Sequence, residues 1–322
     1  MSAAAIYPAI VRAPAELIRP FVTILLCTVV LTALAIYAPT FFKLNNLINI
    51  LVQASTLAVL AIGMSTVMIG GGIDLSLPFN AALSAVLGAM YMRATGDALG
   101  GPLIMVAAAV VIGALNGIAV GYLRMIPFVV TLAMMTVTNG AAVWLTGSIS
   151  IADIPEVFVD PFFTRYFGLP LSVIIATVAA ALGVFLMAST VYGRWLYAVG
   201  INPRAAQVAR IPGERVVAVI YMIAGFTAGI AAIMLTGRLA SASSNLASPS
   251  MVLDVISACV IGGISIYGGS GRVWGAVFGA LFITLLNNAL NAAEISLYVN
   301  QMIRGFIIIG FVALDRFGKM GG

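Results

Sequence analysis

Residues 57–92 read LAVLAIGMSTVMIGGGIDLSLPFNAALSAVLGAMYM, and this stretch decides the fold. Apolar residues fill both of its ends without alternating with polar ones, which favours helices over half-buried strands. Its middle holds three consecutive glycines followed by Asp74, Ser76 and Pro78. Glycine weakens a helix, aspartate and serine cap one, and proline is tolerated in its first turn. The stretch therefore predicts two helices separated by a break near residues 70–78.

The composition extends this pattern to the whole chain. Of its 322 residues, 62% are hydrophobic and 8% are charged, and the mean hydropathy is +1.16. Soluble domains carry about 25% charged residues, so this chain cannot cover a water-facing surface. Within lipid the backbone must satisfy its own hydrogen bonds, which leaves helices or closed barrels. The unbroken apolar runs favour helices, and we expect an all-α integral membrane protein.

A bilayer-spanning helix needs about 20 mostly apolar residues. The sequence holds about ten such segments, and the first is interpreted as a retained span rather than a cleaved signal. They lie near residues 21–38, 47–69, 77–94, 101–122, 126–146, 170–190, 214–236, 251–268, 273–292 and 297–314. We therefore expect an N-terminal segment at 1–20, a single membrane domain at 21–315 and a C-terminal tail at 316–322.

Basic residues predict the orientation of these spans. Ten of the 15 lysines and arginines fall on the side of the N-terminus and four on the opposite side. Cytoplasmic loops are enriched in these residues, so both termini are expected in the cytoplasm. This accounts for the net charge of +5 better than a nucleic-acid partner does.

The two halves of the chain resemble each other faintly. MIGG at 68–71 recurs as VIGG at 260–263, and ALNG at 114–117 resembles LLNN at 285–288. Many transporters consist of duplicated halves. A weak duplication of residues 45–147 and 214–315 and chance similarity between apolar segments both remain open.

Motifs for catalysis, nucleotide binding and metal binding are absent from the sequence. It has no histidine and no phosphate-binding loop motif, and its cysteines, Cys27 and Cys259, lie in separate apolar runs. We therefore expect neither an enzyme nor a cofactor or metal site. The glycine-rich segment GGSGRVWG at 268–275 lacks the lysine of a phosphate loop and is interpreted as a tight turn. Any energy that its function requires must come from a partner or an ion gradient.

Polar side chains within or beside the spans are the candidate pathway residues. Asp74 and Ser76 could cap the helix that starts near residue 77 or contact a solute. The amides and hydroxyls inside the spans could bind neighbouring helices or line a polar pathway. These candidates are Asn116, Thr131, Asn139, Asn287, Asn288 and Asn291, of which the last three are expected to share one helical face with Thr284 and Glu294.

The connection at residues 189–219 lies on the arginine-rich side and contains PRAAQVAR at 203–210. Asn202-Pro203 and Pro212-Gly213 bound this segment and predict a short helix near 202–212. It is interpreted either as a docking element for a partner or as a basic anchoring loop.

Four segments carry a resemblance to a known family. They are GGIDLS at 71–76, IPFVVTLAMMTVTNGAAVWLTG at 126–147, AVGINPRAAQVARI at 198–211, and residues 254–291 from DVISACVIGG to LLNNALN. In this order and spacing the chain, from about residue 45 onward, resembles the membrane permease subunits of bacterial carbohydrate ABC importers. That ribose-permease-like group is related to the branched-chain amino acid permeases. Leu77-Pro78, and Arg210 where the group tends to a small residue, depart from its pattern.

The resemblance implies an inner-membrane permease that works by alternating access. It implies a second permease subunit, as a homodimer or a heterodimer, together with ATP-binding cassette subunits, a periplasmic sugar-binding protein and a sugar substrate. The residues Gly200, Asn202, Ala205 and Ala206 resemble the segment that docks on the ATPase. The alternative is an ion-coupled secondary transporter of a small polar solute, which also has broken helices and intramembrane acids.

Overall fold

The computed structural model describes residues 39–296, 298–303, 305–306 and 309–310. Helices make up most of these residues, and the two strands form a single short hairpin. Within the described part of the chain, seven helices are long and apolar enough to cross a membrane. The prediction of a mostly helical membrane protein is therefore confirmed.

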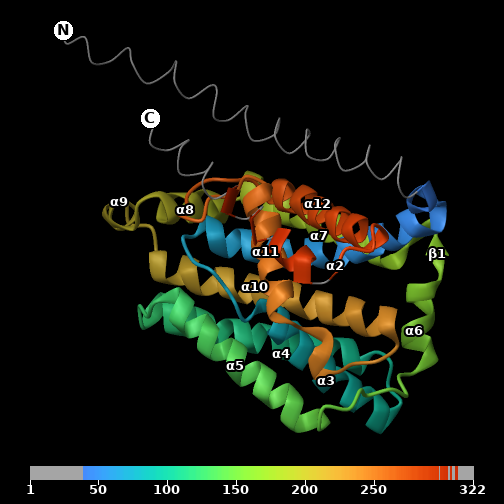
Figure 1. Cartoon of the computed structure of the whole chain (residues 1–322). Helices are drawn as coiled ribbons and strands as arrows, with labels where there is room; N and C mark the ends of the chain where they lie inside the picture. Colours follow the sequence, from blue (N-terminus) through green and yellow to red (C-terminus); the bar gives the residue numbers. More distant parts are fainter. Residues whose placement is uncertain (1–38, 297, 304, 307–308, 311–322) are drawn as a thin grey trace. The chain divides into compact units, whose positions relative to one another are not determined.

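The elements follow one another with short connections, and Figure 1 shows them coloured along the chain. The helices are α2 (Leu44–Ile69), α3 (Leu77–Thr95), α4 (Gly100–Gly117), α5 (Pro127–Thr146), α6 (Glu156–Phe163), α7 (Leu171–Ser189), α8 (Val191–Ile201), α9 (Pro203–Val208), α10 (Gly213–Leu239), α11 (Pro249–Ile261) and α12 (Val273–Ala292). The 3-10 turns η2 (Pro39–Phe42) and η4 (Ser244–Leu246), the π-helical turn η3 (Ile118–Tyr122), and the strands β1 (Arg165–Tyr166) and β2 (Leu169–Pro170) complete the list.

These residues divide into two compact units. One comprises residues 51–281, and the other comprises residues 39–50 with the described residues from 282 onward. In the second unit, Phe41, Ile50 and Ala289 form a small apolar cluster, and Asn46 Nδ2 donates to the carbonyl of Phe41 at 2.8 Å. The residues 69–76, 116 and 189–217, which are discussed below as candidate sites, all belong to the first unit.

The structure changes some of the expected spans. The eighth ends at Ile261 rather than near 268, because residues 262–272 form a connection in which Gly263, Gly268 and Gly269 take positive φ. This confirms the turn expected at the start of 268–275. Helix α3 is less apolar than its neighbours and is not among the seven candidates. The expected span 21–38 and part of 297–314 lie outside the described residues, so the count of ten stays a prediction.

The long helix α10 packs directly on α4 through glycine (Figure 1). A Cβ at Gly113 would lie 2.3 Å from the carbonyl oxygen of Tyr221, and one at Gly117 would lie 2.4 Å from that of Ala218. Real Cβ atoms do not approach so closely, so the two backbones touch only because these side chains are absent. Small residues allow this approach between membrane helices. The contact fixes α4, and with it Asn116, against the core.

Candidate translocation and coupling sites

The first site is the connection between α2 and α3, which runs from residue 70 to residue 76. Gly71 has φ of 84°, a left-handed conformation that glycine adopts without steric cost. A Cβ at Gly72 would lie 2.7 Å from the hydroxyl oxygen of Tyr221, a buried residue of α10. The connection therefore turns tightly and lies against α10, which brings Asp74 into the protein interior.

Asp74, Ser76 and Asn116 form a buried polar cluster. Asp74 Oδ1 accepts from the Ser76 backbone N–H at 3.0 Å and from its hydroxyl at 2.6 Å. Asn116 Nδ2, from α4, donates to Ser76 Oγ at 2.9 Å. The three side chains are 2%, 0% and 0% exposed. A buried carboxylate needs such donors, and here they come from the residue two positions later.

This geometry corrects the predicted cap. Ser76 is the N-cap residue of α3, but no side chain caps that helix, because the Ser76 hydroxyl donates to Asp74 instead. Pro78 occupies the first turn, as expected from the sequence. Asp74 thus holds the connection before the helix rather than the end of the helix itself. The alternative role, contact with a solute, stays a prediction.

Two further polar residues tie neighbouring helices to this connection. Thr131 Oγ1 donates to the carbonyl of Ile73 at 3.1 Å and lies near the carbonyl of Pro127 at 3.0 Å, so α5 is held against the connection. Asn80 Nδ2 donates to the carbonyl of Ala109 at 3.0 Å, which joins α3 to α4, and Asn80 Oδ1 accepts from the hydroxyl of Ser84 within α3. Asn80 was not among the sequence candidates, although Ser76, Asn80 and Ser84 recur at four-residue intervals along one helical face.

The remaining candidate pathway residues do not join this cluster. Asn139 is exposed on α5. Asn287, Asn288 and Asn291 lie on α12 in the other unit, where Asn288 Nδ2 donates to the carbonyl of Thr284 at 2.9 Å and Asn291 is exposed. The shared face was expected to include Glu294, but α12 ends at Ala292 and Glu294 has φ of 56°.

The second site is the connection of α8 and α9. Asn202 Oδ1 accepts from the backbone N–H groups of Arg204 and Ala205, both at 3.1 Å, and so caps α9. Asn202 and Ala205 are exposed, whereas Ala206 is 4% exposed. Arg210, after α9, has φ of 57°, a left-handed conformation that glycine adopts without steric cost.

Helix α8 joins this exposed segment to the first site. A Cβ at Gly200 would lie 1.9 Å from the carbonyl oxygen of Ile69 and 2.7 Å from the backbone nitrogen of Gly269. The Gly269 N–H donates to that same carbonyl at 2.8 Å. Ile69 is the last residue of α2, immediately before the connection that contains Asp74. The α8 backbone is therefore in direct contact with the start of the 70–76 connection.

Two tyrosines fix the position of α8. The Tyr192 hydroxyl donates to the carbonyl of Val216 at 2.9 Å, and the Tyr197 hydroxyl donates to that of Gly271 at 2.7 Å. Burial raises the pKa of both phenols, and for Tyr197 the charge of Arg272 partly opposes this rise. Both residues therefore remain donors at neutral pH, and α8 is anchored at two points.

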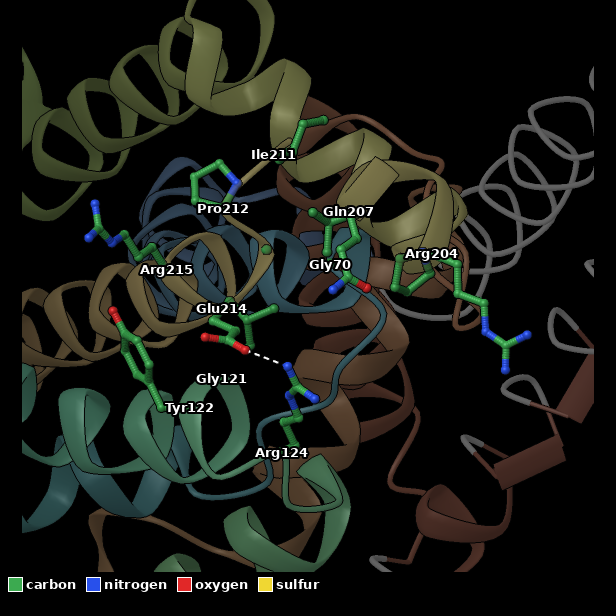
Figure 2. A pocket seen from close by; sticks show the side chains of 14 residues that line it. Gly70, Gly121, Tyr122, Arg124, Arg204, Gln207, Ile211, Pro212, Glu214 and Arg215 are labelled. Atoms are coloured by element: carbon green, nitrogen blue, oxygen red, sulfur yellow. Dashed lines mark hydrogen bonds and ion pairs between the residues drawn. The ribbon is translucent and has the colours of Figure 1, made fainter. Parts of the chain in front are cut away.

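A pocket of about 600 Å³ lies between these elements (Figure 2). Arg124 Nη2 pairs with Glu214 Oε1 at 2.6 Å across its mouth, which connects the α4–α5 turn to the start of α10. Both side chains are largely exposed. The other lining residues are Gly70, Gly121, Tyr122, Val199, Pro203, Arg204, Gln207, Ile211, Pro212, Gly213, Arg215 and Val217. The pocket thus places α9 beside Gly70, the first residue of the connection.

Comparison with known proteins identifies the family. The family model described as "Branched-chain amino acid transport system / permease component" matches residues 46–312. The ribose import permease protein of Bacillus subtilis is 34% identical over 299 residues, 92% of each chain. The galactose/methyl galactoside import permease protein of Haemophilus influenzae is 33% identical over 296 residues, 86% of this chain and 88% of that protein. No solved structure is significantly similar to the chain. The chain therefore belongs to the branched-chain amino acid transport system / permease component family.

Proposed function

We propose that this chain is the membrane subunit of an ATP-driven sugar importer and forms the translocation pathway by alternating access. Relatives at 33–34% identity over most of the chain are import permeases for ribose and galactosides, which supports a sugar substrate. The complex contains a second permease, ATP-binding cassette subunits and a periplasmic sugar-binding protein. The chain crosses the inner membrane about ten times, with both termini in the cytoplasm.

One observation supports this function above the others, namely the contact of Gly200 with Ile69 and Gly269. An ATP-binding cassette subunit bound to α9 can displace α8. Because the α8 backbone at Gly200 already touches its neighbours, α8 cannot move without moving them. The movement therefore reaches Ile69 and the 70–76 connection. Asp74, Ser76 and Asn116 hold that connection to α4, so it moves as one body.

The candidate pathway residues have different roles in this proposal. Asp74, Ser76, Asn116 and Thr131 are buried and bonded to one another or to backbone, so they shape the moving connection. Asn139 and Asn291 present exposed amides on spanning helices, where a polar solute can exchange hydrogen bonds with them. Asn288→Leu tests the α12 face. Lower uptake with unchanged amounts of folded protein supports a pathway, and unchanged uptake assigns Asn288 to helix packing.

Reconstitution tests the function as a whole. The chain is incorporated into liposomes with and without ATP-binding cassette subunits and a sugar-binding protein, and uptake of labelled ribose and galactose is measured. We expect uptake only when ATP and all the partner subunits are present. Uptake by the purified chain alone, driven by a sodium or proton gradient, would instead establish the ion-coupled secondary transporter.

A further inference from the structure

The chain between the spanning helices α5 and α7 ends in an aromatic projection. Strands β1 and β2 pair antiparallel, with Tyr166 opposite Leu169, around a turn made of Phe167 and Gly168. Four apolar side chains surround this turn and define what we name the aromatic tip. They are Phe163, Tyr166, Phe167 and Leu169, with exposed fractions of 68%, 39%, 102% and 46%.

Phe167 is unusual for this position in two ways. Its φ is 54° and that of Gly168 is 81°, the left-handed pair of a two-residue hairpin turn. Asparagine, aspartate and glycine favour such a turn, whereas a bulky aromatic residue is an outlier there. Its ring is also completely exposed. The backbone conformation is strained, and the exposure of the ring to water is unfavourable. Both features point to a surface that buries the ring.

The neighbouring span limits where the tip can lie. Helix α7, one of the seven membrane candidates, begins at Leu171 directly after β2. One residue advances the chain by at most about 3.5 Å, so Phe167 lies within about 14 Å of the start of α7. The headgroup region extends roughly 6 Å on each side of the hydrocarbon core. The aromatic tip is therefore close enough to the start of α7 to reach the lipid–water interface.

Helix α6 holds the projection in this position. In Figure 1 it runs across the end of α10 rather than alongside it. A Cβ at Gly237 of α10 would lie within 2.6 Å of three atoms of the Phe162 ring, and Phe158 is buried on the same side. The inner face of α6 is thus fixed on the bundle, while Val157 and Phe163 point outward with exposed fractions of 77% and 68%.

The acidic residues of this connection lie before the aromatic tip and not within it. Asp153, Glu156 and Asp160 all precede it, and Arg165 is the one charged residue between Phe163 and Leu171. Aromatic residues with a neighbouring arginine are typical of the interface, where the rings enter the headgroup layer and the guanidinium reaches water. A soluble partner steered by charge would instead meet the acidic residues.

We infer that the aromatic tip inserts into the headgroup region of the bilayer and anchors the α5–α7 connection to the lipid surface. The lipid buries the Phe167 ring and thereby offsets its unfavourable backbone conformation. Arg165 pairs with lipid phosphates at the same depth. Helix α6 then lies at the membrane surface, between the spanning helix α5 and the inserted tip.

Site-directed spin labelling of the full chain in nanodiscs tests this inference. A nitroxide is attached at Phe167→Cys in a Cys27→Ser, Cys259→Ser background, and its accessibility to lipid-soluble oxygen and to a water-soluble nickel chelate is measured. Asp160→Cys is the matched control on the same connection. We expect the ratio of oxygen to nickel accessibility to be severalfold higher at 167 than at 160. Leu169→Cys, across the turn, gives an independent second position.

Equal nickel accessibility at positions 167, 169 and 160 would overturn the inference. So would a nitroxide at 167 that is water-exposed in the permease alone and becomes protected only when a soluble binding protein is added. That second outcome would make the tip a protein-docking surface. Because the measurement needs no transport, its result is independent of whether the proposed function holds.

Discussion

Gly200→Ala is the sharpest test of the contact between α8 and the 70–76 connection. The new Cβ would lie 1.9 Å from the carbonyl oxygen of Ile69, whereas real Cβ atoms stay beyond 3.0 Å. The two backbones must therefore separate by about 1 Å. The 2.8 Å bond from Gly269 N–H to Ile69 is lost in the process. A buried hydrogen bond left unmade costs about 1–3 kcal/mol, and crowding adds about 1–3 kcal/mol.

The expected total of about 2–6 kcal/mol corresponds to a fall in the melting temperature of roughly 3–9 °C for a protein of this size. Thermal unfolding of the purified chain measures this directly, and uptake by the assembled complex measures coupling. Gly213→Ala is the matched control, because its Cβ would meet only Val199 at an ordinary 3.8 Å. A Gly200→Ala protein that melts and transports like the control would refute the close contact and the coupling route that depends on it.

The remaining predictions concern single side chains. Asp74→Asn keeps an oxygen that accepts from Ser76, so we expect a near-normal melting temperature and near-normal uptake. Asp74→Ala leaves the Ser76 donors unpaired and should lower the free energy of unfolding by about 1–3 kcal/mol. An equal loss of stability and uptake in both variants would show that the charge of Asp74 matters. Ala206→Asp places a carboxylate at a buried position of α9 and should abolish co-purification of the ATP-binding subunits; their retention at wild-type levels contradicts the docking role. Arg124→Ala and Glu214→Ala break an exposed ion pair, so a double-mutant cycle should give a coupling below about 1 kcal/mol, and a larger value would mean that the pair is buried in the assembled complex. Arg210→Gly removes a left-handed arginine and should stabilise the chain by about 1 kcal/mol, which unchanged or lower melting would disprove.

Much of the fold followed from the sequence because lipid imposes simple rules on length and polarity. The span expected at 126–146 is α5 at Pro127–Thr146, and the expected break lies between Ile69 and Leu77. The resemblance to sugar-importer permeases is confirmed by the relatives. The eighth span was expected to end near residue 268 because the apolar residues at 264, 266 and 267 continue beyond Gly262. Hydropathy alone does not show that the helix ends before them.

The contacts that define the sites could not be predicted in the same way. Ser76 and Asn116 meet although 40 residues separate them, and Gly200 meets Ile69 across a still longer stretch. The periodicity of apolar residues shows which face of a helix a side chain lies on, but not which residue of another helix it contacts. The β1–β2 hairpin could not be predicted either, because a phenylalanine occupies the turn position where asparagine would have indicated it.

The burial of α3 has a consequence for how the chain is made. Asn80 and Ser84 lie within this helix, which packs mainly against α4, α10 and α5. Polar side chains weaken the partition of a lone helix from the translocation machinery into lipid. Helix α10 is synthesised more than 100 residues after α3. Of these three helices, α4 and α5 are the ones made during that interval, and they can shield the amide of Asn80. We therefore expect chains that stop after α3 to leave this helix outside the bilayer core.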